Sequence, residues 1–264
     1  CLDLDITDEP EALADHLFDE LLTKGSEVEI GHATGSRSSL RPVEAQLRAH
    51  DGSPLLERSS VVLLTGGARG ITALVAKELA ARYSCGLVLV GRSALPELTE
   101  DAELASALDA NSLRRIYATR MAGSRPAEIE REVKRLLANR EVSNTLEALR
   151  AAGSKVDYRC CDVRDESSFG ALIESVYEDH GRIDGVVHGA GVIEDKLLAQ
   201  KSDESFDRVF DTKVRGALVL EERLRDDVRF VAFFSSISSA FGNRGQTDYA
   251  AANDLLDKLA HALD

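Results

Sequence analysis

The stretch VVLLTGGARGIT, residues 61–72, decides the fold of this chain. Its first half is an apolar run that predicts a buried strand, and its second half is a glycine-rich turn that leads into the helical pattern ITALVAKELAARY. A pyrophosphate group has to approach backbone N–H groups closely at a helix N-terminus, and glycine leaves room for that approach. The stretch therefore predicts the first strand, turn and helix of a dinucleotide-binding domain.

Four more apolar strands alternate with helical segments. They are GLVLVGR at 86–92, KVDYRCCDV at 155–163, GRIDGVVHGAG at 181–191 and VRFVAFFSS at 228–236. Near-continuous apolar strands with helical crossovers predict a parallel sheet covered on both faces. We therefore expect an α/β, Rossmann-like, doubly wound sheet of strand order 3-2-1-4-5. Residue 264 falls within the helix after the fifth strand, so the later strands of such a sheet are expected to be missing.

Residues 1–57 follow a different pattern, which predicts a small α+β segment and a linker ahead of a catalytic domain at 58–264. The segment CLDLDI reads as a strand, and EPEALADHLFDELL, with Pro10 in its first turn, reads as a helix. Two further strands, EVEIGH at 27–32 and LRPVEAQL at 40–47, are expected around the turn-rich ATGSRSS.

About sixty residues separate the second and third strands of the catalytic domain, where a simple crossover needs about twenty. The segment RPAEIEREVKRLLANRE predicts an amphipathic helix. A separate crossover helix is expected at 143–153, capped by Ser143 or Asn144 and ended by Gly153. The remainder, about 99–141, is predicted to be a helical insertion that forms either a surface or docking structure or a cover over the active site.

Composition narrows the class of protein. The net charge of −14 argues against nucleic acid or an anionic membrane as partner, because both require basic patches. No apolar run is long enough for a membrane span. Four cysteines without metal-ligand spacing predict no metal site and a cytoplasmic location with reduced thiols. The initial Cys1 suggests a piece of a longer polypeptide.

The strand ends supply the residues that we expect to contact the cofactor. Gly66 and Gly70 take the first two glycine positions of a T-G-x-x-x-G-x-G pattern, whereas Thr72 replaces the third. The expected cofactor-binding residues are Thr65, Gly66, Gly67, Ala68, Arg69, Gly70, Ile71, Gly91, Arg92, Ser93, Asp162, Val163, Gly189, Ala190 and Gly191.

The end of the second strand indicates NADPH rather than NADH. An acid at that point would bind the ribose 2′-hydroxyl and repel a 2′-phosphate. Arg92 and Ser93 stand there instead, with Arg69 in the glycine loop, and these groups suit a phosphate. Asp162 either accepts a hydrogen bond from adenine or caps the following helix, and His188 is predicted to be structural rather than a catalytic base.

The stretch FFSSISSAFGNRGQTDYAAAND, residues 233–254, has the serine pair and the tyrosine of a short-chain dehydrogenase, but Asn253 stands where such enzymes have a lysine. A tyrosine acts as an acid near neutral pH only if a nearby cation lowers the pKa of its phenol from about 10. Lys258 lies nine residues after Tyr249, about 180° around a helix, and cannot reach it. Lys213, on the helix between the fourth and fifth strands, is the better candidate.

The placement of Lys213 and Asn253 on exchanged helices resembles the ketoreductase domain of type I polyketide synthases. The resemblance covers about 58–264 and includes TGGARGIT, VGRS, CDVRD, HGAG, TKVRGA, FFSSISS and DYAAAND. GGARGIT and the long insertion are most similar to the ketoreductases of polyunsaturated-fatty-acid synthases. Residues 1–57 resemble the end of the cofactor-less structural subdomain that precedes such domains.

The resemblance implies a role for each catalytic candidate. Tyr249 is expected to donate the proton, Lys213 to relay it, and Ser236 to hydrogen-bond the substrate carbonyl. Asn253 is expected to orient the lysine and its water. Asp195 in the triplet IED, and Phe241 where the opposite stereochemical class has Trp, indicate a 3R product.

The implied function is NADPH-dependent reduction of a β-ketoacyl thioester on an acyl carrier protein, alongside other domains of the same synthase. Arginines of the insertion, among them Arg114, Arg115, Arg120 and Arg125, are candidate docking residues for an acidic carrier. Two alternatives stay open: a non-catalytic scaffold that keeps the fold, and a free-standing reductase of small ketones.

Overall fold

A computed structural model describes residues 2–5, 7–23, 25, 27, 29–33, 35–39, 41, 43–44, 55–95 and 100–263 of the chain. The chain divides into two compact units, Cys1–Asp51 and Gly52–Asp264. None of the described helices is both long and apolar enough to cross a membrane.

The first unit is a three-stranded sheet with one helix. Strand β2 (Ile30–Ala33) pairs in parallel with β1 (Leu2–Leu4) and antiparallel with β3 (Ser36–Ser39), and helix α1 spans Pro10–Leu22. The predicted strand LRPVEAQL is wrong at Arg41, Val43 and Glu44, and its residues 40, 42 and 45–47 lie outside the described ones. The partner of β2 lies earlier because Gly35, at φ 75°, turns the chain back directly after β2. The identity of this unit as the remnant of a structural subdomain stays a prediction.

The second unit contains the predicted doubly wound sheet. Its strands are β4 (Val61–Thr65), β5 (Gly86–Gly91), β6 (Val156–Cys160), β7 (Gly185–His188) and β8 (Phe230–Phe233). They lie in the order β6-β5-β4-β7-β8, and every neighbouring pair is parallel. The predicted α/β architecture is confirmed. The carboxyl ends of β4 and β7, where the chain reverses its direction of winding, are where such sheets bind ligands.

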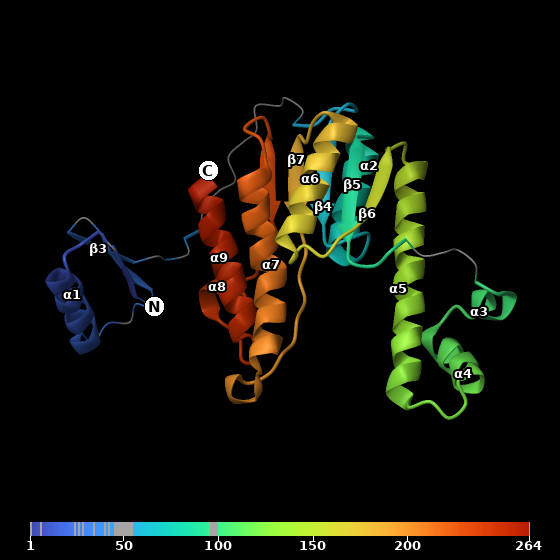
Figure 1. Cartoon of the computed structure of the whole chain (residues 1–264), viewed down its shortest axis with the longest axis horizontal. Coiled ribbons are helices and arrows are strands. Elements are labelled where there is room, and N and C mark those ends of the chain that lie inside the picture. The colour runs from blue at the N-terminus through green and yellow to red at the C-terminus, as the bar shows by residue number, and fades with distance from the viewer. Residues whose placement is uncertain are drawn as a thin grey trace. The chain divides into compact units, whose positions relative to one another are not determined.

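Helices cover both faces of this sheet (Figure 1). The helices of the unit outside the insertion are α2 (Gly70–Tyr83), α6 (Glu166–His180), η1 (Leu198–Gln200), α7 (Asp203–Arg223), α8 (Ser238–Phe241) and α9 (Thr247–Leu263). On one face, Phe169 and Ile173 of α6 and Leu220 of α7 are fully buried against the strands, each contributing about 1.5–3 kcal/mol. On the other face, Ala76 of α2 packs with residues of α5 (Pro126–Ala151).

Helix α5 is a single helix of 26 residues, so the predicted cap at Ser143 or Asn144 is wrong. No glycine or proline interrupts it after Pro126, and the buried stripe continues through Val142, Leu146 and Leu149. A continuous apolar stripe favours one continuous helix over two helices with a boundary at Ser143. The predicted end is confirmed, because Gly153 follows the helix at φ 90°.

The N-terminal half of α5 projects beyond the sheet and carries α3 (Ala102–Ser106) and α4 (Ala110–Arg120) (Figure 1). These helices share a small core of their own around Leu113 and Val133, both fully buried. Arg140 of α5 fastens α3 to this core, since its guanidinium donates to Glu100 and to the carbonyl oxygens of Leu104 and Ala107.

The continuity of α5 can be tested with Asn144→Pro. Proline inside a helix removes a backbone hydrogen bond and clashes with the preceding turn, so we expect a loss of about 3 kcal/mol or more in the free energy of unfolding. Asn144 is exposed, and Asn144→Ala should be neutral or slightly stabilising because alanine has the higher helix propensity. Urea denaturation of the two variants provides the measurement. The opposite ranking, with proline tolerated and alanine costly, is what a helix start at this point would give.

Candidate cofactor and catalytic site

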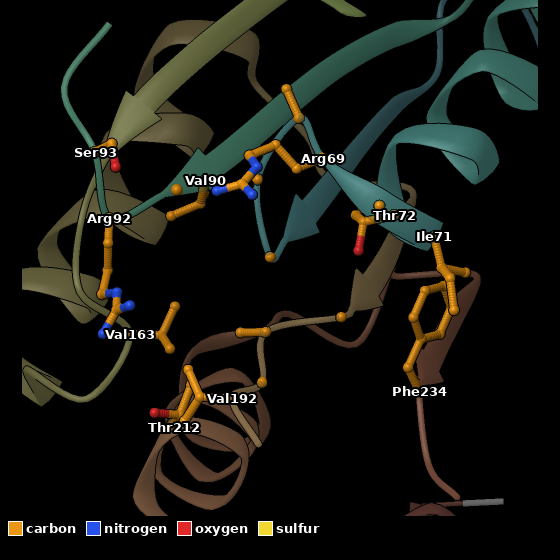
Figure 2. A pocket seen from close by; sticks show the side chains of 18 of the residues that line it. Arg69, Ile71, Thr72, Val90, Arg92, Ser93, Val163, Val192, Thr212 and Phe234 are labelled. Atoms are coloured by element: carbon orange, nitrogen blue, oxygen red, sulfur yellow. The ribbon is translucent and has the colours of Figure 1, made fainter. Parts of the chain in front are cut away.

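A cleft of about 620 Å³ opens at the carboxyl ends of the central strands (Figure 2). It is lined by the glycine loop, by the ends of β5 and β7, by α7, and by Tyr249 of α9. The insertion also reaches it, because Ala138, Asn139, Glu141 and Val142 of α5 form part of the wall. The cleft therefore joins most of the predicted cofactor residues to Lys213 and Tyr249, whereas Ser236, Asn253 and Thr65 are not among its lining residues.

The glycine loop adopts the conformation that its sequence predicts. Gly66, Gly67 and Gly70 have φ values of 99°, 78° and 56°, which side-chain-bearing residues rarely adopt. A Cβ on Gly66 would lie 2.6 Å from the carbonyl oxygen of Gly189, so the first turn allows no side chain. Thr72 is buried and its hydroxyl packs against Gly189, which explains how a threonine fits in place of the third glycine.

Three of the residues expected to select the cofactor gather around the end of β5. Figure 2 shows Arg69, Arg92 and Ser93 there. The carbonyl oxygen of Arg92 accepts a hydrogen bond from Cys160 Sγ, and that of Ser93 accepts one from Tyr158 Oη at 2.9 Å. These bonds fix the backbone of the β5 end and leave the Arg92 guanidinium among the residues that line the cleft.

Glu141 of α5 was not expected in the site. Its Oε1 accepts the backbone N–H of Gly70 at 2.8 Å and its Oε2 accepts Arg69 Nε at 3.0 Å. Partial burial opposes its ionisation, but the two hydrogen bonds outweigh burial and lower the pKa of the carboxyl. A carboxylate thus occupies the N-terminus of α2 beside Arg69. The separation of 71 positions between Gly70 and Glu141 explains why no local pattern revealed it.

Asp162 is neither a helix cap nor a free acceptor in the structure. Both of its carboxylate oxygens bind the side chain of Arg164, which together with the Arg164 backbone N–H lowers the pKa of the carboxyl. The cap of α6 is Asp165, which accepts the backbone N–H of Ser168. The cap alternative for Asp162 is therefore wrong. Its place in the wall of the cleft leaves an adenine contact as a prediction.

His188 connects the cofactor end of the cleft to the catalytic end. Its Nε2 lies 2.8 Å from the carbonyl oxygen of Lys213, and its Nδ1 lies 2.7 Å from Thr65 Oγ1. Because a carbonyl can only accept, Nε2 carries the proton and Nδ1 accepts from the threonine hydroxyl. Complete burial lowers the pKa of His188 to about 4, so the ring is neutral near pH 7. These contacts give the histidine a structural role.

Lys213 and Tyr249 meet at the inner end of the cleft. The ammonium of Lys213 lies 5.4 Å from the centre of the Tyr249 ring and donates to the carbonyl oxygen of Phe234 at 2.6 Å. The residue is 4% exposed, and this burial lowers the pKa of the lysine to about 8. The ammonium consequently titrates closer to neutral pH than that of a solvent-exposed lysine.

Asn253 lies one helical turn after Tyr249 and is fully buried. Its Nδ2 donates to the carbonyl oxygen of Tyr249 at 2.7 Å. Its Oδ1 has no hydrogen-bond partner among the described residues, which is the kind of acceptor that a lysine ammonium or a relaying water satisfies.

Ser236 lies in the turn before α8. Its Oγ accepts from the backbone N–H of Ser238 at 3.2 Å and from the Ser238 hydroxyl at 3.0 Å, so its own hydrogen is left to donate. Its neighbour Ser235 lines the cleft. Of the residues expected to control stereochemistry, Asp195 accepts a hydrogen bond from Gln246 at 3.0 Å, and Phe241 is 70% exposed.

Fold and cleft together are those of the short-chain dehydrogenase class of oxidoreductases, which use a nicotinamide cofactor. The family model described as the KR domain matches residues 60–264. The chain belongs to this family of ketoreductase domains.

Curated relatives and solved structures agree with this assignment. The chain is 33% identical over 250 residues to a polyunsaturated fatty acid synthase component from Thraustochytrium, covering 88% of the chain and 9% of the relative. It is 28% identical to the polyketide synthase PksN of Bacillus subtilis, covering 95% of the chain and 4% of the relative. A solved ketoreductase domain from the bacillaene assembly line superposes with a TM-score of 0.65 at 28% identity, over 99% of the chain and 53% of that domain's chain. The chain thus spans a small part of the synthases it matches.

The burial of Lys213 predicts that the residue opposes folding. A pKa lowered from 10.5 to about 8 corresponds to about 3 kcal/mol in favour of the unfolded state at neutral pH. We expect Lys213→Met to raise the free energy of unfolding at pH 7 by about 1–3 kcal/mol, the lower end allowing for the lost bond to Phe234.

The stabilising effect of Lys213→Met should shrink as the pH rises. The folded state holds fewer protons than the unfolded state between pH 8 and 10.5, so the wild type gains stability relative to Lys213→Met as pH rises through that window. Chemical denaturation at pH 7, 8.5 and 10 measures the gap. A variant that is less stable than the wild type at pH 7 would show that the ammonium is not desolvated as described.

Proposed function

We propose that this domain reduces a β-ketoacyl thioester to the 3-hydroxyacyl thioester with NADPH, the substrate being carried by an acyl carrier protein within a synthase. The observation that carries the proposal is the buried ammonium of Lys213 beside the ring of Tyr249, at the end of a cleft that begins at the glycine loop. A reductase needs an acid that protonates the carbonyl oxygen of the substrate. A tyrosine beside an ammonium can be that acid.

Each catalytic residue has a task that its contacts support. When bound, the reduced nicotinamide supplies the hydride. The Tyr249 phenol donates its proton to the carbonyl oxygen, and the Ser236 hydroxyl, whose oxygen already accepts two hydrogen bonds, donates to that same oxygen. Lys213 stabilises the phenolate that results and returns a proton to it. The side-chain amide of Asn253 donates a hydrogen bond to the carbonyl oxygen of Tyr249 and so fixes the helical turn that carries the proton donor.

The choice of NADPH rests on the cations at the end of β5. Arg69 and Arg92 line the cleft there, and guanidinium groups bind phosphate by paired hydrogen bonds. Glu141 opposes this choice, because its carboxylate already holds Arg69. A 2′-phosphate that binds Arg69 therefore either displaces the Glu141 carboxylate or lies next to it and is repelled by its charge.

A contact of Asp195 supports the 3R product, whereas the arginines of the insertion give little support to docking of the carrier. The hydrogen bond from Gln246 gives Asp195 a defined place beside the segment that leads to Tyr249, as a stereochemical role requires. The insertion gives the carrier less support. Arg114 and Arg125 each pair with an acid of α5, and Arg120 pairs with Asp101 and Glu103. These three arginines are thus largely neutralised as docking residues.

Catalysis is tested by NADPH consumption with a 3-oxoacyl N-acetylcysteamine thioester. Tyr249→Phe removes the acid, and we expect kcat to fall at least about 100-fold while the fold is kept. Tyr83→Phe, a matched loss of a hydroxyl on α2, should leave kcat unchanged. Equal rates for the wild type and Tyr249→Phe would overturn the enzymatic proposal and favour a scaffold. A preference for a small cyclic ketone over the thioester would favour the free-standing type of reductase.

The role of Glu141 is tested by Glu141→Gln, which removes a charge and keeps the acceptor for Gly70. We expect the Kd of NADPH to tighten about three- to tenfold and that of NADH to tighten less, because both carry the pyrophosphate but only NADPH carries the 2′-phosphate that Arg69 is proposed to bind. Fluorescence titration measures both constants. Glu78→Gln, which breaks a similar surface pair with Arg82 on α2, is the control.

Arg92→Asp should act in the opposite direction and weaken NADPH binding more than NADH binding. If Glu141→Gln weakens NADPH instead, the carboxylate positions Arg69 for the phosphate and does not compete with it.

A further inference from the structure

A buried ion pair lies directly beside the candidate catalytic tyrosine. Lys201 follows η1 in the segment between β7 and α7, and Asp248 lies in the first turn of α9, one residue before Tyr249. Lys201 Nζ is 2.5 Å from Asp248 Oδ2, and each side chain is 1% exposed. Neither residue belongs to the serine, tyrosine, lysine and asparagine set described above.

The side chain of each partner makes a further hydrogen bond to a backbone group. Asp248 Oδ1 accepts the backbone N–H of Tyr249 at 2.9 Å. Lys201 Nζ donates to the carbonyl oxygen of Glu194 at 2.9 Å, one residue before Asp195. The pair therefore connects the backbone of the tyrosine to the backbone of the segment that carries the candidate stereochemical residue.

Two further contacts join the same segments. The backbone N–H of Lys196 donates to the carbonyl oxygen of Gly245 at 3.0 Å, and the side chain of Gln246 donates to Asp195. Asp195 and Lys196 are exposed residues, so water competes with both contacts. The buried pair is the contact between these segments that water cannot replace.

Stability alone is a poor explanation for this pair. Removing two charges from water is unfavourable, and apolar residues of similar size stabilise a fold as well or better. A buried pair does, however, require one geometry, since each charge left without its partner is strongly disfavoured. Its contribution is specificity of arrangement rather than net stability.

We infer that the Lys201–Asp248 pair is a positioning device: it fixes the segment around Asp195 against the start of α9 and so sets which face of the ketone is presented when Tyr249 donates its proton. The stereochemical part of this inference depends on the proposed ketoreductase function. The structural part, that the pair holds the two segments together, does not.

The experiment compares four variants with the wild type. Lys201→Met and Asp248→Asn each break the pair, whereas the double variant Lys201→Met/Asp248→Leu replaces both charges by apolar groups and keeps the fold if a single variant unfolds. Lys258→Met is the control, since Lys258 pairs with Asp254 on the surface of the same helix. Thermal unfolding, NADPH binding, kcat and KM with the thioester, and the ratio of 3R to 3S product by chiral chromatography are measured for each.

We expect the pair variants to bind NADPH within about twofold of the wild type, to lose about 10- to 100-fold in kcat, and to give a less selective product ratio. The double variant should recover thermal stability without recovering selectivity, and Lys258→Met should match the wild type throughout. A double variant with wild-type kcat and product ratio overturns the inference, because the pair would then be replaceable by packing.

Hydrogen exchange separates this inference from the proposed function. In the wild type, peptides covering 192–201 and 245–250 should be protected, and Lys201→Met should speed exchange in both without affecting α2. If the wild type does not reduce the thioester, the proposed function fails, yet this measurement still judges the pair. Unchanged exchange in both peptides overturns the inference whatever the activity.

Discussion

The hydrogen bonds of the buried His188 hold the two halves of the site at a fixed spacing. The ring accepts from Thr65, where β4 enters the glycine loop, and donates to the backbone of Lys213 on α7. This arrangement requires a neutral ring, and the burial that lowers the pKa of His188 to about 4 provides it. The cofactor loop and the lysine helix, far apart in the sequence, thereby share one anchor in the core.

Two buried lysines near the tyrosine show two uses of charge in a protein interior. Lys201 faces a carboxylate and stays fixed in one geometry. Lys213 faces a carbonyl oxygen and the tyrosine ring, so its ammonium is desolvated and its pKa falls to about 8. The first arrangement favours rigidity and the second favours proton transfer. Lys201 contacts Asp248 and Lys213 lies over the ring of Tyr249, so the two arrangements act on adjacent residues at the start of α9.

The sequence predicted the sheet, because strand periodicity and the position of glycine act locally. It predicted the meeting of Lys213 with Tyr249 because helix geometry excludes Lys258 and because the chain resembles ketoreductases. It failed where distant packing decides. The stripe through Val142 and Leu146 carries α5 past the polar Ser143, and a local cap signal cannot compete with that burial. Glu141 and the Lys201–Asp248 pair were missed because each contact joins residues more than forty positions apart. Thr72 was noted as a departure, but its fit against Gly189 required the structure.

The unbroken course of α5 places the insertion and the wall of the cleft on one helix. At 1.5 Å per residue, its 26 residues span about 39 Å, and the part from Pro126 to Glu141 spans about 23 Å. It contains no glycine or internal proline at which it could bend. The same helix carries residues of the α3 and α4 core and Glu141, whose carboxylate binds the guanidinium of Arg69. The insertion and the wall of the glycine loop thus share one continuous helix.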